Sequence, residues 1–225
     1  MKPYLVRGGE WCVEAALAVL LKPGMTFYDI GAKHGHYAML ATQFLADDDV
    51  VVAFEPEPRN FEKLVEQTAD WPNIQCAQVA IGEYNLRQRF LRSADSVSLG
   101  KLVGEDSDDS IFVDVMRLDN LHPPALIKMD IEGGEVAALR GASRTLTEAR
   151  SILLIEMHGN AAAIKELLQV HGYVATTFGN DLPLTLNEGG HIIAVPSERW
   201  EILAQFRSVD FPACDRCRAA LEKRV

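Results

Sequence analysis

Residues 27–37 read Phe-Tyr-Asp-Ile-Gly-Ala-Lys-His-Gly-His-Tyr, and this stretch decides the fold. It is typical of an apolar strand that carries Asp29 near its end and runs into a glycine loop. A second apolar run, residues 50–54, ends in Glu55. In an open parallel sheet, ligands bind beyond the carboxyl ends of the strands, where glycine lets the backbone approach and an acid on the next strand binds a ribose diol. The two runs therefore predict a nucleoside-binding crevice.

The spacing of the glycines argues against a dinucleotide. A dinucleotide fingerprint reads G-x-G-x-x-G, whereas Gly31 is followed by Lys33 and His36 at the other two glycine positions. The next glycine is Gly35. An oxidoreductase or a sugar epimerase is further disfavoured because the chain has no Tyr-x-x-x-Lys pair.

Composition narrows the class of protein. With 225 residues, 48% of them hydrophobic, the chain suits one domain with one substantial core. Its formal charge of -10 argues against nucleic acid as a partner, because that affinity rests on clustered basic side chains. The first residues show no signal-peptide pattern and no membrane-spanning run, so we expect a cytoplasmic protein without a membrane partner. A homo-oligomer is compatible with this composition.

The four cysteines do not predict a zinc site. Cys12 and Cys76 are isolated, and Cys214 and Cys217 form a lone C-x-x-C pair. A structural zinc ion needs four ligands, and no second pair lies nearby. We expect four reduced thiols.

Strand-like and helix-like segments alternate, which predicts βαβ units and a doubly wound, mostly parallel seven-stranded sheet in an α/β fold. The predicted strands cover residues 26–30, 50–54, 74–79, 125–129, 152–156, 173–177 and 191–195. The predicted helices cover residues 37–45, 59–69, 135–147 and 161–171. Residues 82–118 break this rhythm, with strand-like runs at 87–91 and 111–118 around a polar, acidic stretch at 104–110 that we interpret as a solvated loop.

A second acidic motif, residues 126–135, reads Leu-Ile-Lys-Met-Asp-Ile-Glu-Gly-Gly-Glu. Its strand places Asp130 at the same sheet edge as Asp29 and Glu55, although an acid there can also cap a helix. Glu135 opens the following helix, where it would favour the helix dipole. The next strand ends in Glu156 and His158, beside Asp130 in the expected strand order.

Six motifs in order resemble the FkbM-type S-adenosylmethionine-dependent methyltransferases. The resemblance spans roughly residues 25–196 and rests on residues 29–37, 53–58, 79–82, 117–121, 127–142 and 154–158. It implies a seven-stranded Rossmann-like class I domain at 26–196, which we expect between a helical lead-in at 1–25 and a helical tail at 197–225. It also implies methylation of a hydroxyl group on a small-molecule acceptor, such as a sugar or secondary metabolite. Lys33 departs from the family pattern, which usually has asparagine there.

The resemblance and the residues together predict an S-adenosylmethionine site. Glu55 would bind the ribose diol. Gly31 and Gly35 would let the backbone pass the methionine portion, while Asp29 would hold the loop or reach the ammonium through a bridging group. Residues 78–80 would flank the adenine. The predicted cofactor-binding residues are Asp29, Gly31, Ala32, Gly35, Glu55, Pro56 and Ala80.

Methyl transfer to a hydroxyl favours a general base, and His158 is the first candidate because an unperturbed imidazole has a pKa of roughly 6.5. Asp130 and then Glu132 follow as catalytic candidates, and Glu156 or Asp130 could orient the imidazole. A purely structural His158 is the alternative. His34 and His36 would meet substrate or face solvent, and Lys33 would contact substrate or remain solvated.

A metal is possible but not favoured. Asp130, Glu156 and His158 have suitable ligand atoms, yet no ligand spacing demands an ion, so we predict no metal site. The other alternative is a non-catalytic binding module on the same fold. The segments at 91–110 and 177–190 would form the walls of the acceptor pocket.

Overall fold

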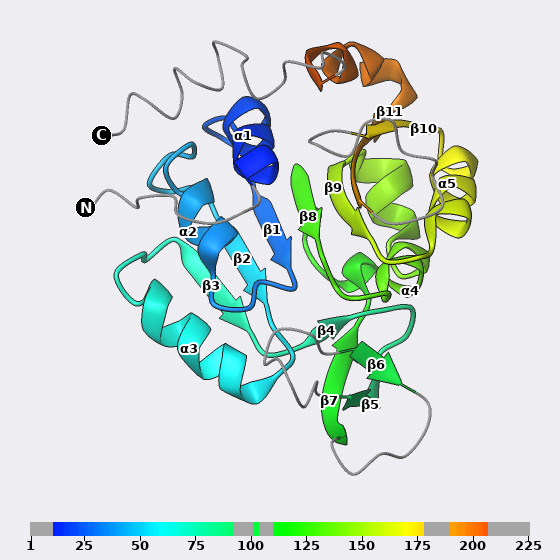
Figure 1. The fold of residues 1–225 in the computed structure, drawn as a ribbon. Helices are drawn as coiled ribbons and strands as arrows, with labels where there is room; N and C mark the ends of the chain where they lie inside the picture. Colours follow the sequence, from blue (N-terminus) through cyan, green and yellow to red (C-terminus); the bar gives the residue numbers. More distant parts are fainter. Residues whose placement is uncertain (1–10, 92–100, 104–109, 178–189, 207–225) are drawn as a thin grey trace.

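The fold centres on one seven-stranded sheet in a computed structural model of the chain, which describes residues 11–91, 101–103, 110–177 and 190–206 (Figure 1). The strand order is β10-β11-β9-β8-β1-β2-β3, and only β11 runs antiparallel to its neighbours. This confirms the predicted mostly parallel sheet. Its strands are β1 (Phe27–Ile30), β2 (Val51–Phe54), β3 (Ile74–Ala77), β8 (Leu126–Met129), β9 (Ile152–Met157), β10 (Tyr173–Thr177) and β11 (Gly190–Pro196).

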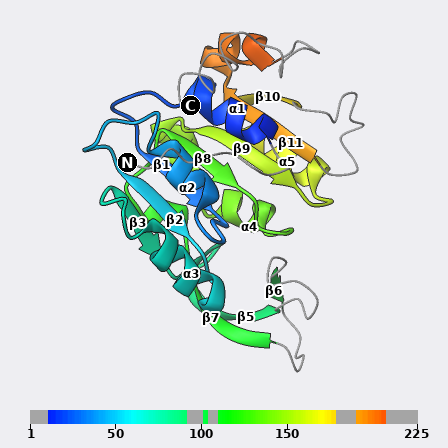
Figure 2. The ribbon, with the colours of Figure 1, turned by 60° about the vertical axis from the view of Figure 1, so that its left-hand side comes forward.

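Helices cover both faces of this sheet (Figure 2). Successive strand residues point to opposite faces, so Leu126 packs with α1, α2 and α3 while Ile127 packs with α4 and α5. Both side chains are fully buried, which stabilises the fold by about 1.5–3 kcal/mol each. The helices are α1 (Trp11–Leu20), α2 (His36–Ala41), α3 (Pro58–Thr68), α4 (Glu135–Arg140) and α5 (Ala161–Val170).

The segment that breaks the βα rhythm forms a second sheet, with strand order β4-β7-β5-β6. Figure 1 shows it below the central sheet, and its first strand follows β3 almost directly. The strand-like runs at 87–91 and 111–118 are confirmed, except that Leu118 begins a 3-10 turn, Leu118–Asn120. The strands are β4 (Ala80–Ile81), β5 (Leu86–Leu91), β6 (Lys101–Val103) and β7 (Ser110–Met116).

Three predicted elements end at least two residues early. The helix expected at 37–45 stops at Ala41, and the strand expected at 74–79 stops at Ala77 because Ala80 pairs with β7 instead. The helix expected at 135–147 is interrupted at Gly141, where a Cβ atom would lie 2.0 Å from the carbonyl oxygen of Gly82. A separate π-helical turn, Thr145–Ala149, follows. The C-terminal segment Ser197–Phe206 is 3-10 helix.

Some expectations fall outside the described residues. These are most of both acceptor-wall segments, the acidic stretch at 104–109, the Cys214 and Cys217 pair and the tail beyond residue 206. Within the described part of the chain, every helix is too short or too polar to span a bilayer.

Candidate active site at the carboxyl ends of the central strands

The glycine loop joins β1 to α2, and both of its glycines have left-handed backbone angles, with φ of 79° at Gly31 and 85° at Gly35. A Cβ atom on Gly31 would lie 1.9 Å from the carbonyl oxygen of Asp130. A Cβ atom on Gly35 would lie 2.7 Å from Leu64 Cδ1 of α3. Close packing against backbone atoms therefore requires glycine at position 31, and a left-handed φ beside two side-chain methyl groups favours glycine at position 35, independently of any ligand.

Lys33 lies in the same loop with a φ of 52°, which is also left-handed. Among L-residues, asparagine tolerates this conformation better than lysine does. The departure from the family pattern noted above therefore falls at a position where asparagine suits the backbone. The backbone N–H of Lys33 donates to Glu55 Oε2 at 2.9 Å. This hydrogen bond connects the loop to the end of β2 and does not depend on the Lys33 side chain.

Glu55 lies directly after β2 with a relative exposure of 5%. Its second oxygen, Oε1, accepts the backbone N–H of Glu57 at 3.0 Å. Burial raises the pKa of Glu55 to about 7. An ionised carboxylate has about four lone-pair sites. Besides the two backbone N–H groups, the Asn60 side chain also hydrogen-bonds Glu55, so acceptor capacity for a hydroxyl remains.

The smaller predicted cofactor residues lie around this loop. Ala32 is buried, and its N–H donates to the Phe54 carbonyl oxygen at 2.9 Å. Pro56 follows Glu55, and Ala80 begins β4 in the second sheet. All three thus lie near the carboxyl ends of β1, β2 and β3.

Asp29 is fully buried within β1. Its Oδ2 accepts the backbone N–H of Ala38 in the first turn of α2 at 3.1 Å, and its Oδ1 lies 3.4 Å from Lys128 Nζ. Of the two roles expected for Asp29, these contacts favour holding the glycine loop.

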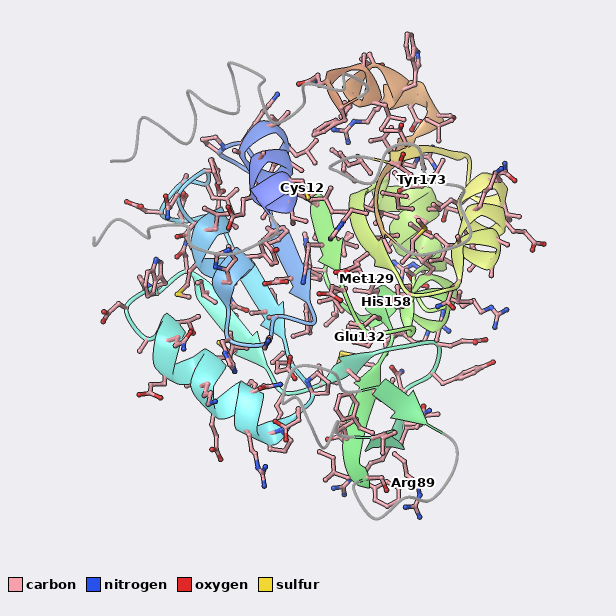
Figure 3. The ribbon with its side chains drawn as sticks, viewed as in Figure 1. Cys12, Arg89, Met129, Glu132, His158 and Tyr173 are labelled. Atoms are coloured by element: carbon pink, nitrogen blue, oxygen red, sulfur yellow. The ribbon has the colours of Figure 1, made fainter. Side chains whose placement is uncertain are left out.

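His158 lies just after β9 among four carboxylates, and Figure 3 shows it beside Glu132 at the edge of the sheet. Its Nδ1 lies 3.0 Å from Glu135 Oε1, within hydrogen-bond distance. Its Nε2 faces three other carboxylates, at 3.4 Å for Glu132 and 3.8 Å for both Asp130 and Glu156. The structure thus brings all three predicted catalytic residues together.

Glu135, rather than Glu156 or Asp130, orients the imidazole. It is fully buried at the first position of α4, and it also accepts bonds from Gly133 N at 3.1 Å and Asn160 Nδ2 at 3.0 Å. The hydrogen bond to Glu135 raises the pKa of His158 to about 9, so the imidazole is protonated at neutral pH. The helix-dipole interpretation of Glu135 missed this contact.

Glu132 and Glu156 differ in their surroundings. Glu132 has a left-handed φ of 52°, and burial raises its pKa. Glu156 lies opposite His191 of β11, with 3.5 Å between Oε2 and His191 Nε2, and the hydrogen bond to His191 lowers its pKa. The left-handed conformation of Glu132 is sparsely populated and costs free energy, and such conformations are common at functional sites.

Sequence reasoning also missed Lys128 and His191. Lys128 interrupts an apolar strand, which is a visible signal for a buried, paired cation. His191 gives no such signal, because its contact depends on the pairing of β11 with β9.

The two histidines of the glycine loop have protein partners. His34 Nε2 lies 3.2 Å from Asn60 Oδ1 of α3, and His36 Nε2 lies 2.7 Å from Glu14 Oε1 of α1. Glu14 is buried, so His36 joins the glycine-loop helix to α1. A substrate contact by His36 was one of the two expectations, and this geometry favours a structural role instead.

Asp130, Glu156 and His158 each bring one potential metal-ligating atom into a group whose atoms lie within 4.8 Å of one another. The three side chains are partly exposed. A protonated imidazole among carboxylates accounts for this grouping, so the chemistry derived below uses no metal.

Comparisons with known proteins agree with this architecture. Residues 29–178 match the Methyltransferase FkbM domain. No protein of curated function matches the chain by sequence.

Three solved structures show the same fold. The methyltransferase FkbM from Methylobacillus flagellatus is 20% identical to this chain, with a TM-score of 0.53, and the match covers 76% of this chain and 43% of the FkbM chain. The precorrin-6y C5,15-methyltransferase from Geobacter metallireducens is 13% identical with a TM-score of 0.53, covering 87% and 93%. The SAM-dependent O-methyltransferase from Thermotoga maritima is 10% identical with a TM-score of 0.52, covering 87% and 68%. This chain thus spans less than half of the FkbM structure.

Proposed function

The chain belongs to the FkbM methyltransferase family, and from that premise we propose that it transfers a methyl group from S-adenosylmethionine to a hydroxyl of a small molecule, most favourably a sugar or secondary metabolite. The family match supports methyl transfer. The choice of a hydroxyl is supported by the paired base at the sheet edge.

The residues present fit the cofactor. S-adenosylmethionine supplies the activated methyl group when it is bound. Glu55 is a buried carboxylate at the end of β2, with remaining acceptor capacity for a hydroxyl of the ribose diol. The glycine loop beside it would hold the methionine portion, and Ala80, in β4, would lie on the adenine side.

His158 is the proposed general base, and its contact with Glu135 is the observation that carries the assignment. With Nδ1–H directed at a buried carboxylate, Nε2 remains the atom that takes a proton from the acceptor hydroxyl. Glu135 then stabilises the imidazolium, as the carboxylate does in a Ser-His-Asp triad. A positioned base contributes about 10²–10⁴-fold to the rate.

Asp130 and Glu132 flank Nε2, where each can accept a hydrogen bond from a neighbouring acceptor hydroxyl and so hold the reacting one in line. Because the pKa of His158 is about 9, the base form is scarce at neutral pH. We therefore expect the transfer rate to rise as pH approaches 9.

The test has two stages. Calorimetry first measures binding of S-adenosylhomocysteine to the chain. A panel of sugars, polyols and phenols is then incubated with S-adenosylmethionine, and formation of S-adenosylhomocysteine is measured. His158→Gln should lower the transfer rate about 10²-fold or more. His122→Gln, at an exposed histidine that offers only its backbone carbonyl to Tyr28, is the matched control.

The outcomes separate the claims. Undiminished transfer by His158→Gln would remove His158 as base. Cofactor binding without transfer to any acceptor would favour the non-catalytic module, and failure to bind S-adenosylhomocysteine would overturn the cofactor proposal itself.

A further inference from the structure

Lys128 is a buried cation that the proposed methyl transfer does not use. It lies in β8 between Ile127 and Met129, and its side chain is only 6% exposed. Burying an ammonium in an apolar strand is unfavourable unless opposite charges and hydrogen bonds compensate it. Its partners therefore show why the fold places a lysine there.

The Lys128 ammonium reaches three oxygens on two sides of the site. Its Nζ donates to the carbonyl oxygen of Gly31 at 3.3 Å and lies 3.4 Å from Asp29 Oδ1. It also lies 3.7 Å from Asp130 Oδ2, and 4.9 Å from the centre of the Tyr37 ring. The contact with Gly31 is a hydrogen bond, whereas the two carboxylate contacts are ion pairs at longer distances.

The two carboxylates differ in exposure and in what else they contact. Asp29 is fully buried, and its other oxygen binds the start of α2. The Asp130 side chain is 27% exposed, and its other oxygen lies 3.8 Å from His158 Nε2. One ammonium thus joins the glycine loop to the acid that faces the imidazole.

We propose that Lys128 is a positioning residue, which holds Asp130 in a fixed relation to the glycine loop and balances the carboxylate charge around His158. This inference rests on the proposed function, in which the loop binds the cofactor and His158 serves the acceptor. In this proposal, Lys128 acts through Asp130 and the glycine loop rather than on a reacting atom.

The charges around His158 set the expected effect. Removing the Lys128 charge would leave the carboxylates around His158 with less positive charge beside them. The protonated form of the His158 imidazole would then be more stable, and its titration midpoint would rise. The groups that face the imidazole or its carboxylates are Asp130 and Glu132 after β8, Glu135 of α4, Glu156 of β9, His191 of β11 and Lys128 itself.

The first measurement needs no ligand. Nuclear magnetic resonance follows the titration of the His158 imidazole in the wild type and in Lys128→Met, which keeps the apolar stem and removes the charge. We expect a higher titration midpoint in Lys128→Met. Lys22→Met removes an exposed lysine that precedes β1, at the opposite edge of the sheet, and should leave the midpoint unchanged.

The second measurement is the affinity for S-adenosylhomocysteine by calorimetry. Loss of a hydrogen bond from a charged donor to the loop should weaken binding about tenfold or more. Lys128→Met leaves the buried Asp29 carboxylate unpaired, and the variant could fail to fold for that reason. In that case, the His158 midpoint and the affinity are compared between the double variant Asp29→Asn/Lys128→Met and the single variant Asp29→Asn.

An unchanged His158 midpoint in the folded variant would overturn the proposal and leave Lys128 as a counter-ion for Asp29 alone. A raised midpoint with weakened binding supports it. If the wild type itself does not bind S-adenosylhomocysteine, the cofactor proposal fails, and the His158 midpoint alone decides the role of Lys128.

Discussion

Replacing Glu135 by glutamine tests how the site controls its imidazole. Glu135 is fully buried, and its contact with His158 Nδ1 is the main cause that raises the His158 pKa to about 9. A hydrogen bond to a charged group is worth roughly 1.5–3 kcal/mol, and one pH unit corresponds to about 1.4 kcal/mol. The His158 titration midpoint should therefore fall by roughly one to two pH units in Glu135→Gln.

The same contact predicts a pH-dependent stability. Because the folded pKa of about 9 exceeds the ordinary 6.5, the stabilisation is complete below pH 6.5 and is lost as pH rises through 9. A pKa change from 6.5 to about 9 corresponds to roughly 3 kcal/mol of unfolding free energy. The imidazole is 25% exposed, so solvent screening reduces this to roughly 1–2 kcal/mol.

Two assays check this reasoning. Magnetic resonance gives the His158 midpoint, and urea unfolding at pH 6 and above pH 9 gives the change in unfolding free energy, which should be smaller in Glu135→Gln than in the wild type. Glu148→Gln removes an exposed carboxylate paired with Arg144 and should change neither quantity. A His158 midpoint in Glu135→Gln equal to that of the wild type would refute the assignment of the raised pKa to this hydrogen bond.

Three further predictions concern the glycine loop and the cofactor side, and a fourth concerns metal dependence. Glu55→Gln should weaken S-adenosylhomocysteine binding about tenfold or more by calorimetry. Because burial raises the Glu55 pKa from 4.5 to about 7, the wild type should lose unfolding free energy as pH rises across that interval. Glu55→Gln should remove this contribution to the loss. Lys33→Asn should raise the unfolding free energy by roughly 1 kcal/mol by relieving a left-handed lysine, whereas Lys63→Asn, on exposed α3 surface, should not. Gly31→Ala should cost roughly 3 kcal/mol or more in chemical denaturation, and Gly133→Ala, with a positive φ but no atom within 4 Å of its Cβ position, only about 1 kcal/mol. Methyl transfer should persist after dialysis against a chelator, and its complete loss with recovery on adding Mg²⁺ would contradict the metal-free chemistry.

The sequence predicted the central sheet because its signals are local. Short apolar runs separated by helical periodicity fix which residues form strands, and parallel strands place their carboxyl ends at one edge. The sequence therefore predicts that Asp29, Glu55 and Asp130 lie at the same edge of the sheet. The resemblance of six motifs identified the family, and the domain match confirms it.

Contacts between side chains on different elements were not predictable in this way. Glu135 reads as a helix-start acid in sequence, yet its burial against His158 depends on how α4 packs beside β9. The pairing of His191 with Glu156 depends on the register between β11 and β9. A local pattern does not specify such a register.

The glycine loop shows the same division. By itself, the sequence determined that a strand, a glycine loop and a helix follow one another at a sheet edge, and it predicted a nucleoside-binding crevice there, because hydrophobic periodicity and glycine act locally. Only the tertiary structure decided why Gly31 must be glycine, why asparagine would suit position 33, and how Lys128 joins Asp29 to Asp130. Those features arise where segments distant in the chain approach within a few ångströms, and there packing and charge decide which atoms meet.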